Sequence, residues 1–357
     1  MSSSPAGAAA DSVQKVYVHG TAVHRSWADR SASLTDLIFS ATRTALERAS
    51  IRWRDIDSVV LGAHDVTDGR SLTSMVTAPA AGAYLKDEIR LGEDGASAFV
   101  LGTAQVRSGS CGACIVAAWG RASESDPDAV AAALFDPFFS QPLGLTEITV
   151  SALRAGAALA RYPGYQEWRG PAGARRRAAA GVEARRPAVQ LPLRSGELPV
   201  WSDIVAVAVL SAQPGPVEVR GVGMSTEPYQ VGDRDLLGLP ALSQASGQAL
   251  RSAGCAVGEV GVLELDGLTL FDEALALEAV GAASAGDGMR VLAQRSDINA
   301  DGGFAAGYCA PAMGLVRICA AAGRLTGGSD LALATGSTVV AAQGQAAIVL
   351  SRNQGGG

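Results

Sequence analysis

Cysteine and histidine are the residue types best suited to nucleophilic, redox or metal chemistry, and this chain of 357 residues has five of the first and three of the second. Cys111 and Cys114 have the CxxC spacing of redox-active dithiols. They enter a predicted buried strand instead of opening a helix, which favours core packing over a redox role. Because no second CxxC or other cluster with metal-ligand spacing accompanies them, we predict no metal site. An odd, sparse set of cysteines also argues against a disulfide framework and favours a reducing cytoplasm.

Arginine is concentrated in one segment, from Arg161 to Arg194, which contains YQEWRGPAGARRR and EARRP. Guanidinium groups match phosphate oxygens in bidentate fashion. The segment is therefore a candidate cap over the phosphates of a nucleotide-bearing substrate, with Arg175 and Arg176 as candidate ligands. The alternative is a solvated helical surface whose arginines balance nearby acids. The whole chain has 29 basic and 35 acidic residues, so its charge favours neither nucleic acid nor an anionic membrane as a partner.

The elements that position these groups form a weak internal repeat. In the first half, a strand VYVHGTAV, an amphipathic helix LTDLIFSATRTALERA and a short strand DIDSVVLG follow one another. The second half repeats this order with VEVRGVGM, LPALSQASGQALRSAG and EVGVLELDG. A helix of small residues, a glycine stop and a buried strand then follow in both halves. Two such copies predict a duplicated α/β fold with two mixed or parallel sheets, each covered by helices.

A segment without a counterpart separates the two copies. We expect a disordered tail over residues 1–15, an N-terminal half over 16–120 and a C-terminal half over 216–357. Residues 121–215 would form a loop or cap insertion, with a strand that returns to the N-terminal half. No apolar run reaches the length of about 18 residues that a membrane span requires. The N-terminus does not read as a secretory signal, so we expect a cytoplasmic protein.

A resemblance to the thiolase superfamily rests on the order of five motifs, of which two segments carry the candidate site residues; DIDSVVLG, the helix ending at Gly109 and the closing QGQAAIVLS also fit. DINADGGFAAGYCAPAMGLVRI resembles the late glycine-rich motif of thiolases, in which Asn-x-x-Gly-Gly precedes Gly-His-Pro and a helix. Tyr308 stands at the histidine of that motif, and the matching residues are Asn299, Gly302, Gly303 and Gly307. VGVLELDGLTLFDEALALEAVG resembles the strand and helix that usually read Glu-Leu-His, with Asp266 at the histidine. The resemblance covers nearly the whole chain and implies a duplicated, five-layered α-β-α-β-α fold with a loop-domain insertion.

The sequence departs from the thiolase pattern at the catalytic positions. The nucleophilic cysteine of a thiolase begins the buried helix of the first half, where this chain has Gly92 or a neighbour within two residues. No cysteine precedes Ser110, and none follows Cys319. The chain therefore most resembles thiolase-like proteins of the lipid-transfer and aldolase type, which lack the cysteine and carry a tyrosine in the glycine-rich motif.

Three side chains remain as candidate catalytic groups. Tyr308 can donate a hydrogen bond to a carbonyl, or act as an acid or base if its pKa falls; the alternative is a buried tyrosine that satisfies a backbone carbonyl. Asp266 would be a second polar group in the same pocket. Asp94 would be an N-cap of the helix from Gly95, or else a general base, and we expect the helix dipole to hold it ionised. The resemblance also implies that Asn299, Gly302, Gly303 and Gly307 shape the substrate site through their backbone.

These residues lead to two functional hypotheses. The first is an enzyme that makes or breaks a carbon–carbon bond in an acyl-CoA or carrier-bound thioester, by aldol, retro-aldol or acyl-transfer chemistry. It would need no cofactor beyond the coenzyme A of its substrate. The second is a catalytically degenerate thiolase subunit that serves as the scaffold of an active partner. Both imply a homo- or heterodimer with a thiolase-like chain, and the resemblance adds a small zinc-ribbon/OB-fold protein as a further candidate partner.

Overall fold

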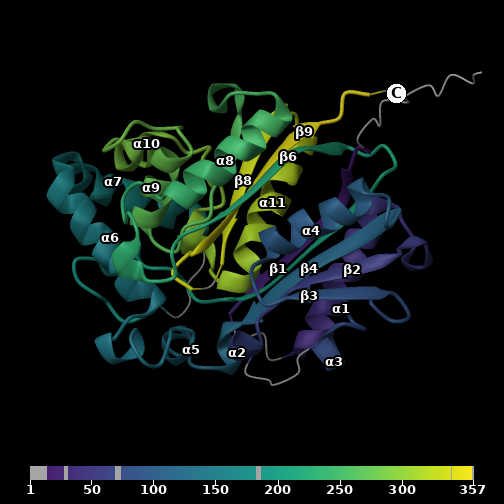
Figure 1. Cartoon of the computed structure of the whole chain (residues 1–357), viewed down its shortest axis with the longest axis horizontal. Helices are drawn as coiled ribbons and strands as arrows, with labels where there is room; N and C mark the ends of the chain where they lie inside the picture. The colour runs from purple at the N-terminus through teal and green to yellow at the C-terminus, as the bar shows by residue number, and fades with distance from the viewer. Residues whose placement is uncertain (1–13, 28–30, 69–73, 182–185, 339, 356–357) are drawn as a thin grey trace, which may run out of the picture.

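The computed structural model describes residues 14–27, 31–68, 74–181, 186–338 and 340–355, so the predicted tail lies almost entirely outside the described residues. Within this part of the chain, the strands form one mixed sheet in the order β3-β2-β4-β5-β1-β6-β9-β8-β7 (Figure 1). The N-terminal half contributes β1 (Tyr17–Ser26), β2 (Ser58–Gly62), β3 (Asp87–Leu91), β4 (Ala113–Arg121) and β5 (Asp203–Ser211). The C-terminal half contributes β6 (Val217–Thr226), β7 (Val262–Glu264), β8 (Leu331–Ser337) and β9 (Gly344–Arg352).

The strand pairing repeats between the two halves. β2 is parallel to β4, whose other neighbour β5 is antiparallel to it and to β1. In the same way β7 is parallel to β8, whose other neighbour β9 is antiparallel to it and to β6. The two predicted sheets are joined into one, because Tyr17 pairs with Glu218 and Val18 with Val217. These two residue pairs join the edge strands β1 and β6 and make the sheet continuous.

Helices cover the sheet in layers, as predicted. α1 (Leu34–Ala49) packs on the outer face of the N-terminal half, and α8 (Pro240–Ala253) packs on β6 and β9 of the C-terminal half. α4 (Gly95–Arg107) and α11 (Ala310–Thr326) pack against each other and lie between the two halves (Figure 1). The five layers α-β-α-β-α confirm the thiolase-like fold class. The larger hydrophobic core lies around the central helices, and a smaller one lies beneath α1.

Equivalent glycines bring a strand and a helix together in both halves. A Cβ at Gly20 of β1 would collide with the backbone of Ala45 and Ala49 in α1. A Cβ at Gly221 of β6 would collide with the backbone of Ala249 in α8. Each glycine also follows a shift in the strand register. The glycine in each copy of the repeat therefore permits the close packing of the outer helix on its strand.

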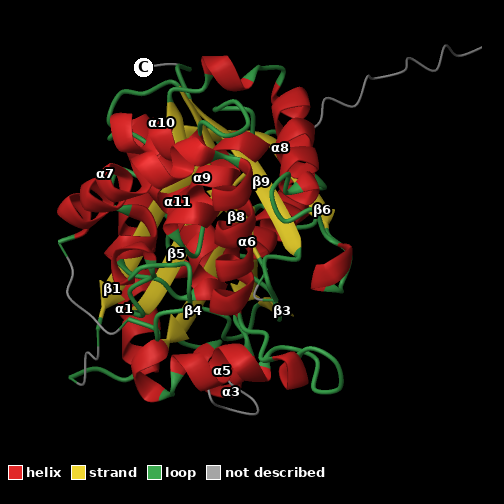
Figure 2. Ribbon diagram, turned by 90° about the vertical axis from the view of Figure 1, so that its left-hand side faces the viewer, coloured by secondary structure: helices red, strands yellow, loops and turns green. Residues whose placement is uncertain are grey.

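Between β4 and β5 the chain forms a helical insertion, which we call the cap. It contains α5 (Pro127–Ala133), α6 (Glu147–Arg161) and α7 (Pro163–Ala180). α6 begins at a Thr146 capping box and turns its apolar face inward. α6 and α7 pack on α9 (Leu270–Ala279), and α7 also packs on α10 (Gly288–Gln294). In Figures 1 and 2, α5 lies at the same end of the molecule as α3 (Ser74–Thr77), and it contacts α2 (Asp65–Asp68).

Short 3₁₀ turns complete the described elements: η1 (Trp53–Asp55), η2 (Ala122–Glu124), η3 (Gln141–Leu143), η4 (Ser195–Glu197), η5 (Val231–Asp233), η6 (Val257–Glu259) and η7 (Gly303–Ala306). Among the residues that the structure describes, no helix has both the length and the apolar character to cross a bilayer.

Candidate active site

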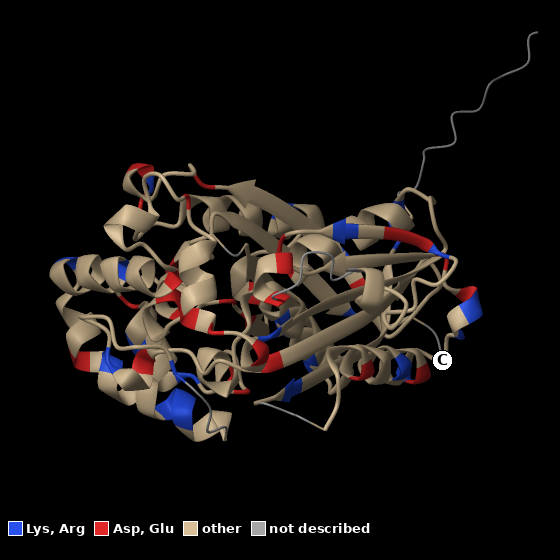
Figure 3. Ribbon diagram, turned by 90° about the horizontal axis from the view of Figure 1, so that it is seen from below, with Lys and Arg blue, Asp and Glu red and all other residues tan. Residues whose placement is uncertain are grey.

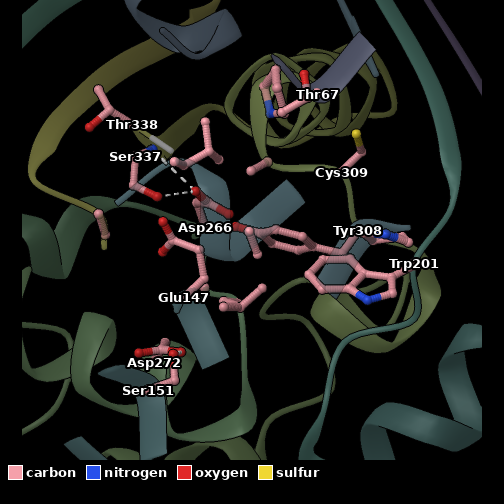
Figure 4. A pocket seen from close by; sticks show the side chains of 18 of the residues that line it. Thr67, Glu147, Ser151, Trp201, Asp266, Asp272, Tyr308, Cys309, Ser337 and Thr338 are labelled. Atoms are coloured by element: carbon pink, nitrogen blue, oxygen red, sulfur yellow. Dashed lines mark hydrogen bonds between the residues drawn. The ribbon is translucent and has the colours of Figure 1, made fainter. Parts of the chain in front are cut away.

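A cavity of about 990 Å³, counted with its opening to solvent, lies between the cap and the ends of β7 and β8. Its walls are mainly apolar and come from α5, α8 and the segments around Leu268 and Pro311. Polar side chains gather on one part of the wall: Glu147, Ser151, Asp266, Asp272, Tyr308 and Ser337 (Figure 4). The cavity therefore combines space for an apolar group with a small polar site.

Tyr308 reaches this polar site from the segment just before α11. Its backbone is fixed by two hydrogen bonds, from its own N–H to the Val200 carbonyl (2.7 Å) and from the Ser202 N–H to its carbonyl (3.1 Å). Figure 4 shows the ring extending toward Asp266 and Glu147. Burial, together with nearby carboxylates, raises the pKa of the Tyr308 phenol well above its ordinary value. The phenol is therefore neutral and can donate a hydrogen bond. A role as a base would need a lowered pKa, and the pKa is raised instead.

Asp266 follows β7, and only one of its two carboxylate oxygens accepts hydrogen bonds from the described residues. Its Oδ2 accepts hydrogen bonds from the Ser337 N–H (3.1 Å) and the Ser337 hydroxyl (2.6 Å). Its Oδ1 is buried and has no hydrogen-bond partner in the described part of the chain. Burial raises the pKa of Asp266 to about 6, and the bonds from Ser337 oppose that rise. Asp266 is thus still mostly a carboxylate at neutral pH, with one oxygen available to accept a proton.

Glu147 is a third titratable group of the cavity, and the sequence did not point to it. It is the first residue of α6, and its Oε1 accepts a hydrogen bond from the Ala341 N–H (2.7 Å). Burial raises the pKa of Glu147 to about 8, so the side chain is mostly protonated at neutral pH. The only signal in the sequence is a glutamate just after a capping threonine, which is common at exposed helix starts.

Asp272 also faces the cavity but is fully engaged by protein groups. Its oxygens accept from the Ser151 hydroxyl (2.6 Å) and from Arg154 (3.1 Å), both on α6 of the cap. Thr269 adds a backbone N–H (3.0 Å) and a hydroxyl (2.8 Å). Asp272 therefore joins the cap to α9 and has little capacity left for a substrate.

The structure places Asp94 at the N-cap of α4, outside the cavity lining. Its carboxylate accepts from the Ala96 N–H (3.1 Å) and from the N–H and hydroxyl of Ser97 (both 3.0 Å). Gly314 and Gly336 leave the space that this side chain fills. The N–H donors of the helix end favour the ionised form of Asp94, as expected, but burial opposes them and raises its pKa to about 7, so the side chain is only partly ionised at neutral pH. A catalytic role for Asp94 has no support from this position.

The matching residues of the glycine-rich motif lie behind the cavity, and none of the four is among its lining residues. Asn299 is fully buried; its Nδ2 donates to the Leu265 carbonyl (2.8 Å) and to Glu273 (2.9 Å). Gly302, Gly303 and Gly307 have φ values of 105°, 62° and 124°, which glycine adopts without strain. The motif shapes the turn that carries Tyr308, so any effect of these residues on a substrate is indirect.

The two candidate phosphate ligands also lie away from the cavity. Arg176 is 2% exposed, forms an ion pair with Glu273 (2.8 Å) and donates to the Asn299 carbonyl (3.1 Å). A phosphate-binding role for Arg176 is therefore wrong, because the fold buries its guanidinium. Arg175 donates to the Ala293 carbonyl (2.8 Å). Figure 3 shows Lys and Arg segments interspersed with Asp and Glu segments along the ribbon.

The described cysteines form no disulfide. Cys309 is the one thiol that lines the cavity in the described part of the chain, and its burial raises its pKa far above the ordinary value. Cys111 and Cys114 are buried at the start of β4. In the described residues, no group of His, Cys, Asp and Glu is arranged to hold a metal ion. The polar chemistry of the cavity thus rests on Tyr308 and carboxyl groups.

The layered sheet is that of a thiolase-like fold. No protein-family model matches the sequence, and no curated protein matches it either. Among solved structures, the chain is similar to the "Ltp2-ChsH2(DUF35) aldolase", with a TM-score of 0.77 and 17% sequence identity. The match covers 96% of this chain and 99% of that one. At this identity the similarity shows a shared fold, that of a thiolase-like aldolase.

Proposed function

We propose that this protein is an aldolase of the thiolase fold, which makes or breaks a carbon–carbon bond next to the thioester of an acyl-CoA or a carrier-bound acyl group. The observation that carries the proposal is the meeting, in one cavity, of the neutral Tyr308 hydroxyl and the unpartnered Oδ1 of Asp266. The similar structure is named as an aldolase, which supports the proposal. Retro-aldol cleavage needs no covalent acyl-enzyme, so it suits a site without an activated thiol.

The two groups have complementary tasks in this reaction. In a 3-hydroxyacyl thioester, Asp266 accepts the proton of the 3-hydroxyl, and the bond between C2 and C3 breaks as C3 becomes a carbonyl. The electron pair of that bond forms the thioester enolate. Tyr308, held neutral by burial, donates a hydrogen bond to the enolate oxygen, where negative charge develops. A charged tyrosine would repel that oxygen, so the raised pKa suits the task.

The substrate and partners follow from the same proposal. The apolar walls of the cavity suit a large apolar group attached at C3. A thiolase-like second subunit and a small zinc-ribbon/OB-fold protein are proposed partners; the name of the similar aldolase also joins two components. β3 pairs only with β2 in the described part of the chain and leaves a sheet edge available for a second subunit. Coenzyme A as the thioester carrier and a cytoplasmic location stay predictions.

The test is an assay of 3-hydroxyacyl-CoA cleavage, with the chain alone and together with the proteins encoded beside it. Tyr308→Phe and Asp266→Asn should each lower kcat by about 100-fold or more. Tyr229→Phe, at an exposed tyrosine, is the matched control and should leave the rate unchanged. Cleavage that is unaffected by both site variants contradicts the proposal. Activity found only in a complex, and dependent only on a cysteine of the partner, would favour the scaffold hypothesis.

A further inference from the structure

Glu147 is fixed at the cavity wall by the segment between β8 and β9. Its Oε1 accepts the Ala341 N–H, while Arg154 and Arg234 donate to the Ala341 carbonyl (3.1 and 2.9 Å). Ala341 and Ala342 both have positive φ values, of 50° and 53°, which are uncommon for alanine. Three side chains thus hold the backbone N–H and carbonyl of Ala341, a residue in an unusual conformation. Glu147 is part of that arrangement, so its carboxyl has a defined position.

The second oxygen of Glu147 has no hydrogen-bond partner among the described residues, although the side chain lines the cavity. Figure 4 shows Glu147 between Asp266 and Asp272, next to the end of the Tyr308 ring. Arg154 is the nearby cation, but it is paired with Asp272 (3.1 Å). Arg234 is occupied by carbonyl groups. No cation of the described residues is therefore committed to Glu147, which agrees with its preference for the protonated form.

The proposed cleavage leaves one step without a residue. Once the bond between C2 and C3 has broken, the enolate must receive a proton at C2 before the acyl thioester can leave. Asp266 takes up the hydroxyl proton, and Tyr308 is engaged at the enolate oxygen. A third group that is protonated at neutral pH and faces the same space is required, and Glu147 meets both conditions.

We propose that Glu147 is the catalytic acid that protonates C2 of the thioester enolate and, in the reverse direction, the base that removes this proton. The assignment rests on the aldolase function proposed above. In the forward step the O–H bond of Glu147 breaks as the C2–H bond forms. Asp266 meanwhile holds the proton of the 3-hydroxyl and releases it to water, from which Glu147 recovers its own. Protons and electrons balance over the cycle without a further reactant.

The test separates proton transfer at C2 from cleavage of the carbon bond. Incubation with acetyl-CoA or propionyl-CoA in D₂O measures exchange of the C2 protons, which requires only the enolate and the group that exchanges its proton. We expect exchange with the wild-type protein and a loss of about 100-fold or more in Glu147→Gln. Glu167→Gln, at an exposed glutamate of α7, is the matched control and should exchange normally.

Glutamine preserves the acceptor for the Ala341 N–H, so Glu147→Gln should fold and should melt no lower than wild type at pH 6. Glu147→Asp serves as a second variant. It keeps a carboxylic acid at this position but shortens the side chain, so the acid lies farther from the cavity and should support partial exchange. No exchange by the wild-type protein, or undiminished exchange in Glu147→Gln, overturns the assignment. If exchange depends on Glu147 but no 3-hydroxyacyl-CoA is cleaved, the role of Glu147 stands and the aldolase function is refuted. If 3-hydroxyacyl-CoA is cleaved but exchange does not depend on Glu147, the aldolase function stands and the role of Glu147 is refuted.

Discussion

Ser337 donates two hydrogen bonds to the same oxygen of Asp266, one from its backbone N–H and one from its hydroxyl. Both stabilise the carboxylate, and both leave Oδ1 unpaired toward the cavity. Ser337 is the last residue of β8, and Asp266 follows the adjacent strand β7. The parallel pairing of these strands therefore sets both the orientation and the acidity of the proposed base.

Replacement of the Ser337 hydroxyl tests this relationship. In Ser337→Ala the carboxylate loses its shortest hydrogen bond, so the pKa of Asp266 should rise from about 6. The acid limb of the pH profile for cleavage should then move to higher pH, while the rate at alkaline pH changes little. Ser243→Ala, at an exposed serine of α8, should leave the profile unchanged. An unshifted acid limb in Ser337→Ala would show that this limb does not report Asp266.

Stability should fall as the pH rises from about 4 to about 8. Burial raises the pKa of Asp266 to about 6, of Asp94 to about 7 and of Glu147 to about 8. At these three positions the native state binds more protons than the unfolded state over this range, so their titration favours unfolding as the pH rises. The lowered pKa values of His19 and His64 act in the opposite direction, but only below about pH 6.5. Thermal melting at pH 5.5 and pH 8.5 checks the expectation, and the lower melting temperature should be at pH 8.5.

One group with a lowered pKa and one variant sharpen that experiment. The pKa of Asp301 is lowered by Arg317 and Arg25 against the effect of burial, so its contribution to stability is lost only as the pH falls below about 4. Glu147→Gln removes one of the raised groups, so its melting temperature should exceed that of wild type increasingly between pH 5 and pH 8. A constant difference across that range would mean that Glu147 does not titrate there in the folded protein.

Because a glycine permits close strand–helix packing in both halves, replacement of either glycine by alanine should lower stability by a similar amount. Gly20→Ala and Gly221→Ala each place a Cβ against the backbone of an outer helix, and each should lower the free energy of unfolding by about 1–3 kcal/mol or more. Gly156→Ala in α6 meets open space and should raise it by about 0.5–1 kcal/mol. Urea denaturation measures all three. Tolerance of alanine at one of the paired positions only would mean that the two halves do not share this packing.

The fold could be predicted from the sequence because the internal repeat is visible in short segments, each of which indicates a strand, a helix or a turn. Alternating apolar strands and glycine in the same order in both halves predicted the duplicated layers, and the glycine-rich motif placed Tyr308 before a central helix. Glu147 was missed because the orientation of α6 depends on Ser151 and Arg154 meeting Asp272 about 120 residues later. The raised pKa of Asp94 could not be predicted, because a sequence shows the helix N-terminus but not the burial that opposes its effect.

A buried ionic network supports the turn that carries Tyr308. Arg317 of α11 is 1% exposed and donates to Glu264 of β7 (3.3 Å) and to Asp301 (2.9 Å). Asp301 also accepts the Gly303 N–H (2.9 Å) and pairs with Arg25 of β1 (3.1 Å). The network thus ties the glycine-rich turn to a central helix and to strands of both halves.

Arg317→Met should therefore destabilise the protein strongly. The substitution leaves the carboxylates of Glu264 and Asp301 without their buried partner, and losses of about 3–5 kcal/mol are typical when one member of a buried pair is removed. Arg43→Met is the matched control, because Arg43 pairs with Glu47 at 3.5 Å on the exposed face of α1, and it should change stability by less than about 1 kcal/mol. Denaturant unfolding of both variants at pH 6 measures the difference. Equal effects of the two substitutions would contradict a structural role for the Arg317 network, because only Arg317 is enclosed by the fold.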